Sequence, residues 1–211
     1  MKLVVTEIFY SLQGEGPFIG LPSVFIRLGG CIEPLCPWCD TGYAWHEFSE
    51  MGPDEIIVEV NRHACKDVVI TGGEPFLQWQ TGLKDLHEEL VRSGYCLSYE
   101  TSGKIGIPAL EDATIVMSPK YIEGKWHLPL ENIGIAHYFK FVAEDAAALG
   151  EIDRFVKDHA ITKDRVFIMP QGKTSAEQLK RMETVFSFCR DNGYMMSPRL
   201  HVLIFDNKRG V

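Results

Sequence analysis

Three of the six cysteines in this 211-residue chain fall within nine residues, and that cluster limits the possible folds more than any other feature. Cys31, Cys36 and Cys39 are separated by four and then by two residues. Thiolates are soft ligands that suit iron–sulfur clusters and zinc. A cubane cluster that binds only three cysteines leaves one iron open to a small molecule. The spacing therefore predicts a [4Fe–4S] centre and a fold that presents these three thiols together.

Other interpretations of the cysteines stay open at this point. Three free thiols can simply pack in a core. A structural zinc site needs a fourth ligand, which His46 or Cys65 could supply. The spacing also matches plant-type [2Fe–2S] ferredoxins, whose fourth cysteine lies farther along the chain, as Cys65 does. Otherwise we expect Cys65, Cys96 and Cys189 to be packing thiols, because a disulfide framework is unusual in a cytoplasmic protein.

Composition and charge restrict the class of protein. Hydrophobic residues make up 45% of the chain and charged residues 24%, which is ordinary for one globular domain spanning residues 1–211. No apolar run reaches the ~20 residues that cross a bilayer, and the acidic Glu7 comes before a signal-peptide core can form. We therefore expect a cytoplasmic protein without a membrane partner. The net charge of −8 argues against nucleic acid as a partner.

Short apolar runs alternate with amphipathic stretches along the chain. The runs predict strands over residues 23–28, 67–71, 96–100, 114–117, 138–142 and 166–169. The amphipathic stretches predict helices over residues 53–64, 83–92, 145–158 and 176–192. Such alternation indicates an α/β fold with mainly parallel strands. A full eight-fold barrel needs about 250 residues, so we expect a partial, open TIM-like barrel of about six mainly parallel strands with covering helices.

Polar and glycine-rich segments follow directly after the expected strands. They are Cys31, residues 71–75, residues 100–103, residues 118–120 and Gln171. The carboxyl ends of parallel strands meet at one edge of a sheet, which is where functional groups gather in such folds. The sequence therefore predicts one site at this edge, with the cysteines in it.

Two of these segments resemble the radical S-adenosylmethionine superfamily. They are Gly30-Cys31…Cys36-Pro37-Trp38-Cys39-Asp40-Thr41 and Thr71-Gly72-Gly73-Glu74-Pro75. The resemblance implies that the three cysteines hold a [4Fe–4S] cluster whose open iron is chelated by S-adenosylmethionine. Most members of the superfamily have three residues between the first two cysteines, whereas this chain has four, Ile32 to Leu35.

Further patches resemble one family within that superfamily, the 7-carboxy-7-deazaguanine synthases. They are residues 7–16, with the segment Gln-Gly-Glu-Gly, residues 24–27, the Cys-Asp-Thr segment, His201 and residues 207–211. The resemblance implies a radical-mediated carbon–nitrogen lyase of queuosine and deazapurine biosynthesis. Its reaction contracts 6-carboxy-5,6,7,8-tetrahydropterin to 7-carboxy-7-deazaguanine with loss of ammonia. S-adenosylmethionine would supply a 5′-deoxyadenosyl radical that takes a hydrogen atom from the substrate and later regains it.

The resemblance also assigns binding roles residue by residue. The expected contacts to S-adenosylmethionine are Trp38, Asp40, Gly73, Glu74, Ser118, Pro119, Lys120 and Gln171. Thr41 matches a position that binds Mg²⁺. The expected contacts to the pterin are Leu12, Gln13, Gly14, Glu15, Arg27, Thr71, His201 and Val211. The family further implies a reductant protein such as flavodoxin and a homodimer.

Arg27 also has a direct chemical interpretation. It lies in an apolar strand four residues before Cys31, and its planar guanidinium suits a substrate carboxylate. Two alternatives remain beside the lyase: a radical activase of an anaerobic enzyme, and a non-enzymatic iron–sulfur electron carrier that uses Cys65 as fourth ligand. The activase would not account for Arg27 or for the Gln-Gly-Glu-Gly segment, and the carrier would not account for the polar segments that follow the later strands.

Overall fold

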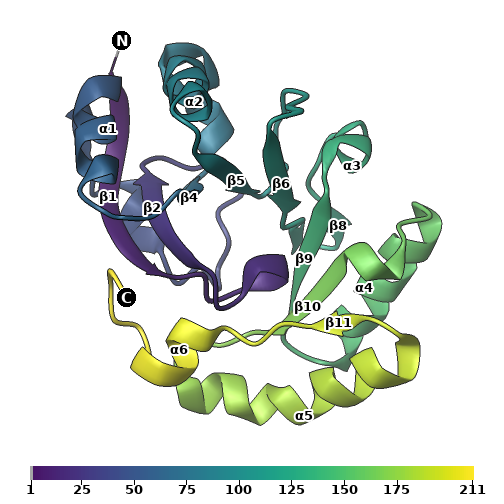
Figure 1. Ribbon diagram of the computed structural model, residues 1–211. Helices are drawn as coiled ribbons and strands as arrows, with labels where there is room; N and C mark the ends of the chain where they lie inside the picture. Colours follow the sequence, from purple (N-terminus) through teal and green to yellow (C-terminus); the bar gives the residue numbers. More distant parts are fainter. Residues whose placement is uncertain (1) are drawn as a thin grey trace.

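The computed structural model describes residues 2–211, in which one curved nine-stranded sheet carries helices on its outer side (Figure 1). The strands are β1 (Leu3–Leu12), β2 (Pro22–Leu28), β3 (Ser49–Met51), β4 (Asp67–Gly72), β5 (Cys96–Thr101), β6 (Ala113–Met117), β9 (Tyr138–Ala143), β10 (Val166–Pro170) and β11 (Met195–Met196). A separate hairpin consists of β7 (Tyr121–Ile122) and β8 (Lys125–Trp126). The helices are α1 (Pro53–Asn61), α2 (Leu83–Arg92), α3 (Asn132–Ile135), α4 (Ala146–Asp158), α5 (Ser175–Asn192) and α6 (Leu200–Phe205).

The six strands predicted from the sequence form the parallel centre of the sheet. They are β2, β4, β5, β6, β9 and β10, which lie side by side in chain order and pair in parallel. Each begins and ends within one residue of the expected bounds. The partial, open barrel is therefore confirmed. Because all six strands point the same way, their carboxyl ends meet at one edge.

The edge beside β2 was not predicted as a strand. β1 is ten residues long and pairs antiparallel with β2, and the short β3 pairs antiparallel with β1. Among the residues expected to contact the pterin, Leu12 is the last residue of β1, and Gln13 and Gly14 follow it. The register places Glu7 opposite Arg27 and Phe9 opposite Phe25. Residues directly opposite in a pair share one face of the sheet, so β1 adds an acid and an aromatic ring beside Arg27.

The expected helices are present as α1, α2, α4 and α5, with small shifts at their ends. α1 ends at Asn61 rather than at residue 64. Asp145 is the N-cap of α4 rather than its first residue, and its side chain accepts a hydrogen bond from the backbone of Ala148. The connection from β5 to β6 contains no helix, so the barrel lacks one of its covering helices there.

Strand alternation divides the sheet into an apolar outer face and a polar inner face. The outer residues Leu28, Ile70, Tyr99 and Phe139 are completely buried beneath the helices. On the inner face, the register pairs Arg27 with Thr71. Successive residues of a strand point to opposite faces. Charged side chains on the inner face can therefore alternate along one strand with core side chains on the outer face. No helix within residues 2–211 has both the length and the apolar character that a bilayer crossing requires.

The C-terminal segment returns to the start of the chain, as the yellow ribbon beside β1 and β2 shows (Figure 1). The backbone of Gly16 donates a hydrogen bond to Ser197 Oγ at 2.7 Å, and the backbone of Leu200 donates to the carbonyl of Gly14 at 2.9 Å. These contacts place α6 against the loop that follows β1. Residues from both ends of the chain therefore meet beside the carboxyl edge of the sheet.

Candidate functional site

Two adjoining cavities lie at the carboxyl edge of the parallel strands. The first, which we call the cysteine cavity, is open to solvent and is lined by Cys31, Cys36 and Cys39. The second, the arginine cavity, is lined by Arg27. Six residues line both cavities: Glu15, Asp40, Thr41, Thr71, Gly72 and Glu100. Because they share these six residues, the two cavities lie side by side.

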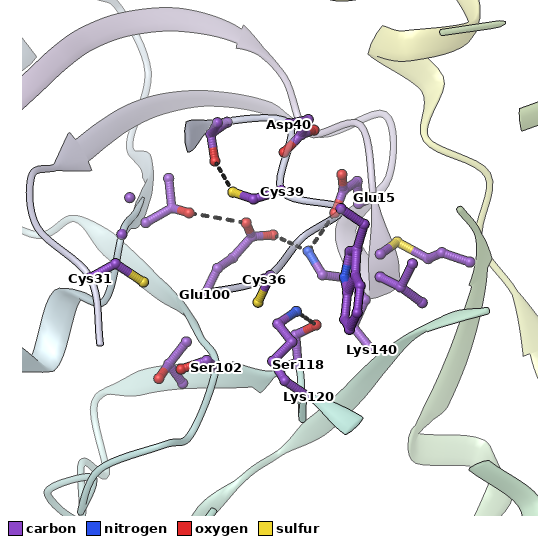
Figure 2. A pocket seen from close by; sticks show the side chains of 18 of the residues that line it. Glu15, Cys31, Cys36, Cys39, Asp40, Glu100, Ser102, Ser118, Lys120 and Lys140 are labelled. Carbon is purple, nitrogen blue, oxygen red and sulfur yellow. Dashed lines mark hydrogen bonds and ion pairs between the residues drawn. The ribbon is translucent and has the colours of Figure 1, made fainter. Parts of the chain in front are cut away.

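The three cysteines come from the loop that follows β2, and their thiols are free. The backbone of Cys39 donates a hydrogen bond to the carbonyl of Cys36 at 3.0 Å, which forms a tight turn between these two residues. Burial raises the pKa of the Cys31 thiol, while the nearby Lys104 acts in the opposite direction. Figure 2 shows the three side chains around one opening. The expected grouping of these thiols at the strand edge is therefore present.

Cys65 lies far from this group. Its thiol donates a hydrogen bond to the carbonyl of Pro22 at 3.2 Å. Pro22 begins β2, whereas the cysteine loop follows its last residue, Leu28. Six steps along a strand span roughly 20 Å. Cys65 therefore lies at the opposite edge of the sheet, which excludes it as a fourth ligand in a ferredoxin-like or zinc site.

The other two cysteines differ from each other. Cys189 is buried in the core between α5 and the sheet, as expected for a packing thiol. Cys96 is exposed at the start of β5, so its expected packing role is wrong.

The donor set fits a multinuclear cluster better than a single metal ion. Within residues 2–211, no three His, Cys, Asp or Glu side chains lie close enough to hold one metal ion. In an iron–sulfur cubane, by contrast, each cysteine binds a different iron, and the sulfurs are spread around the cluster. Three separate thiols that open on one cavity match that requirement.

The Gly72–Pro75 turn packs directly on the start of the cysteine loop. The backbone of Gly73 donates a hydrogen bond to the carbonyl of Leu28 at 3.1 Å, and the backbone of Glu74 donates to the carbonyl of Gly30 at 2.9 Å. A Cβ atom at position 73 would lie 1.6 Å from the Gly30 carbonyl oxygen. Only glycine permits this approach.

Gly73→Ala is expected to lower the free energy of unfolding by about 3 kcal/mol or more, because the added methyl group forces two backbones apart. Urea unfolding followed by circular dichroism measures this change. Gly106→Ala is the matched control, since a Cβ atom there meets nothing within 4 Å, and a change within about 0.5 kcal/mol is expected. Equal stability of the two variants would contradict the close packing.

Glu74 lies behind the cavity surface rather than on it. Its side chain is completely buried and accepts hydrogen bonds from Thr101 Oγ1 at 2.7 Å and from the backbone of Ser102 at 3.0 Å. Burial raises the pKa of this carboxyl group. The side chain therefore ties the end of β4 to the end of β5, and only the backbone of this turn remains available to a cofactor.

The remaining residues expected to contact S-adenosylmethionine are grouped together. Trp38, Asp40, Gly73, Ser118, Lys120 and Gln171 line the cysteine cavity. Pro119 lines a neighbouring, more apolar cavity, which shares Trp38, Lys120 and Gln171 with the first. Lys120 Nζ donates to Ser118 Oγ at 2.7 Å, and burial lowers the pKa of this lysine.

All the residues expected to contact the substrate line the arginine cavity. They are Leu12, Gln13, Gly14, Glu15, Arg27, Thr71, His201 and Val211. Arg27 Nε donates to Glu7 Oε1 at 2.7 Å, and Tyr43 donates to the same oxygen at 2.9 Å. Phe9 and Phe25 stack at 5.0 Å and line the cavity too. The cavity therefore combines a fixed guanidinium with a flat aromatic surface.

A buried lysine joins two carboxylates between the cavities. Lys140 Nζ lies 2.6 Å from Glu15 Oε2 and 2.8 Å from Glu100 Oε1, as Figure 2 shows. Arg199 Nε donates to the other oxygen of Glu15 at 2.9 Å and also pairs with Asp40. Although burial acts to raise it, the pKa of Glu15 lies well below its ordinary value because of Lys140, Arg199 and His201. Burial alone would lower the pKa of Lys140. The two carboxylates outweigh this effect, and the pKa of Lys140 lies above its ordinary value.

Sequence reasoning missed four of these side chains. Lys140 had a usable signal, since it is the one charged residue in the strand Tyr138–Ala143. Glu100 was recognised at a strand end but received no role. Glu7 was seen only as part of a motif, and Arg199 lies in a segment with no distinctive pattern.

Comparisons with known proteins agree on one family. The chain is 36% identical over 220 residues to the 7-carboxy-7-deazaguanine synthase of Pyrobaculum aerophilum, covering 99% of this chain and 97% of that protein. It is 35% identical to the 7-carboxy-7-deazaguanine synthase of Hyperthermus butylicus, covering 96% and 92%. The fold matches the crystal structure of QueE from Escherichia coli with a TM-score of 0.77 and 24% identity, covering 95% of each chain. No protein-family model matches the sequence.

Proposed function

Because this chain belongs to the 7-carboxy-7-deazaguanine synthase family, we propose that it converts 6-carboxy-5,6,7,8-tetrahydropterin to 7-carboxy-7-deazaguanine with loss of ammonia. It is a radical S-adenosylmethionine enzyme of queuosine biosynthesis. The observation that carries the proposal is the pair of adjoining cavities: one presents three free thiols, and the other presents an arginine beside two aromatic rings.

Cys31, Cys36 and Cys39 would hold the [4Fe–4S] cluster. When bound, the cluster and S-adenosylmethionine supply the radical that abstracts a hydrogen atom from the substrate. The Gly72–Gly73 backbone and the side chains of Ser118 and Lys120 would bind S-adenosylmethionine in the same cavity. The indole of Trp38 faces both this cavity and the apolar one, which suits a flat adenine ring.

Arg27 would bind the carboxylate of the pterin. Glu7 occupies the Nε donor of Arg27, which leaves the two Nη groups to form a paired contact with a carboxylate. Phe9 and Phe25 would pack against the bicyclic ring. These three side chains fix the position and the orientation of the substrate.

Glu15 and Glu100 would accept hydrogen bonds from the N–H groups of the pterin. Both carboxylates line the arginine cavity, and both are paired with Lys140. The low pKa of Glu15 keeps it anionic at neutral pH, and an anionic carboxylate is a pure acceptor. Gln13 Nε2 donates to Glu100 at 3.2 Å, which directs this acid toward the same cavity.

The finer parts of the proposal rest on the family resemblance. Thr41 lines both cavities, and its hydroxyl would bind Mg²⁺ together with the substrate carboxylate and water. A reductant protein such as flavodoxin would supply the electron. We also propose that the chain acts as a single domain, forms a homodimer and works in the cytoplasm.

Anaerobic turnover tests this function. Protein reconstituted with iron and sulfide is incubated with dithionite, S-adenosylmethionine and 6-carboxy-5,6,7,8-tetrahydropterin, and the products are identified by mass spectrometry. We expect 7-carboxy-7-deazaguanine and its dependence on all three additions. If 5′-deoxyadenosine forms without any deazapurine, the radical chemistry stands and the proposed substrate is wrong.

A further inference from the structure

The loop between Cys31 and Cys36 contains one residue more than most members of the superfamily have. Its residues Ile32–Leu35 lie outside any helix or strand. Backbone carbonyls in such a loop need partners other than a sheet or helix ladder. Inside the loop, Glu33 accepts a hydrogen bond from the backbone of Leu35 at 2.9 Å. The carbonyls of Ile32 and Pro34 are bound from outside.

Lys104 provides that outside partner. Its Nζ donates to the carbonyl of Ile32 at 3.3 Å and also to the carbonyl of Pro34. The lysine lies in the loop after β5 and lines the cysteine cavity. One ammonium group therefore joins two carbonyls on the same side of the cysteine loop and brings a positive charge to the cavity.

The loop that carries Lys104 is itself firmly anchored. Asn132 is completely buried, and its Nδ2 donates to the carbonyls of Gly103 at 2.8 Å and Ile105 at 2.7 Å. Its Oδ1 accepts from the backbone of Ile107 at 3.1 Å. Both neighbours of Lys104 are thus held by one side chain of α3. The lysine acts from a fixed support and not from a free surface loop.

We propose that Lys104 is a positioning residue for the iron–sulfur cluster. It holds the carbonyls of Ile32 and Pro34 so that Cys31 and Cys36 face one cavity, and its charge favours uptake of an electron by the cluster. The inference rests on the proposed function only in taking the three cysteines as cluster ligands.

The charge effect follows from the chemistry of such clusters. Uptake of one electron from a reductant makes the cluster more negative, and a nearby cation stabilises that state. Reduction potentials of iron–sulfur clusters depend on the net charge and on the hydrogen bonds around them. Removal of the lysine charge therefore shifts the potential to more negative values.

The test compares Lys104→Met, Lys104→Arg and a matched control, Lys66→Met. Lys66 also donates to a backbone carbonyl, that of Ser93 at 3.1 Å, but it lies outside both cavities. The first readout is the rate at which an iron chelator removes iron from the reconstituted protein under anaerobic conditions. The second is the midpoint potential, measured by dithionite titration with electron paramagnetic resonance.

For Lys104→Met we expect iron release about tenfold faster than in the wild type, together with a more negative potential. Lys104→Arg keeps the charge and the donors, so both values stay near those of the wild type, as they do in Lys66→Met. Wild-type values in Lys104→Met, or equal impairment of Lys104→Arg and Lys104→Met, would overturn the proposal.

Two further results are distinguishable from these. If Lys104→Met fails to fold, Lys104→Arg decides: wild-type iron release and potential support the proposal, and loss of both overturns it. If the wild-type protein binds no iron at all, the proposed function itself fails. If the wild-type protein binds iron and the Lys104 variants release it at the same rate, only the proposed role of Lys104 is overturned.

Discussion

Replacement of Lys140 by methionine is expected to lower the free energy of unfolding by about 3–5 kcal/mol. The side chain of Lys140 is 5% exposed and lies between Glu15 and Glu100. Methionine fills a similar volume but leaves two carboxylates without their shared cation. Buried charges that lose a partner carry the full cost of desolvation. Urea unfolding at pH 7 measures the change.

The loss of stability caused by Lys140→Met should become smaller at acidic pH. The pKa of Glu15 is depressed in the folded chain, so the stability from its ion pair is complete above the ordinary carboxyl pKa of about 4.3 and disappears as the pH falls through the depressed value. Below that range the protonated Glu15 no longer needs Lys140 as a counter-ion. The difference between wild type and Lys140→Met should therefore narrow below about pH 4.5. A constant difference down to pH 3 would refute the electrostatic cause.

Lys157→Met serves as the control for Lys140→Met. Lys157 forms an ion pair with Asp153 at 2.6 Å on the exposed face of α4, and its side chain is 64% exposed. Such a pair contributes about 0.5 kcal/mol or less. Adding Glu100→Gln to Lys140→Met should recover part of the lost stability, because one unpaired charge is then removed.

Cys36→Ala is expected to abolish turnover, lowering the rate of product formation by at least about a thousandfold. One of the three proposed ligands is then missing, and the iron content after anaerobic reconstitution should fall sharply. Cys36 lines the cysteine cavity together with Cys31 and Cys39. Iron analysis and the visible absorption of the reconstituted protein give the result, and product formation is measured in the same samples.

Cys65→Ala is the matched control for the cysteine experiment. Its thiol lies beside Pro22, at the far end of β2 from the cysteine loop. We expect iron content and turnover within about twofold of the wild type and a loss of stability near 1 kcal/mol. Loss of the cluster in Cys65→Ala would instead indicate a four-cysteine carrier and would contradict the lyase.

The parallel centre of the fold was predictable because its strands are short apolar runs separated by helices with clear ends. β1 was not predicted. Its apolar alternation is disturbed by a register shift between Val5 and Glu7, and polar residues appear on both of its faces. β1 lies between β2 and the short edge strand β3, which pairs with it only over Leu3–Val5. A strand in such a position has a weaker apolar pattern than a parallel strand buried on both faces.

The residues that line the two cavities were also largely predictable, since motif positions and strand ends carry them; their individual roles stay predictions. The charge network between the cavities was not predictable. Lys140 meets Glu15 across 125 positions of the chain, and Arg199 meets the same acid across 184. Such pairs arise from tertiary packing, and the sequence near each partner contains no trace of the other.

Six residues line both cavities, with Thr71 and Glu15 among them. Under the proposed function, S-adenosylmethionine and the pterin would both contact these residues, and binding of one would be thermodynamically linked to binding of the other. If one compound changes the dissociation constant of the other by some factor, the second compound changes the dissociation constant of the first by the same factor. Substitution of one of these six residues would then be expected to change the affinity for both compounds, and each affinity would depend on whether the other compound is bound.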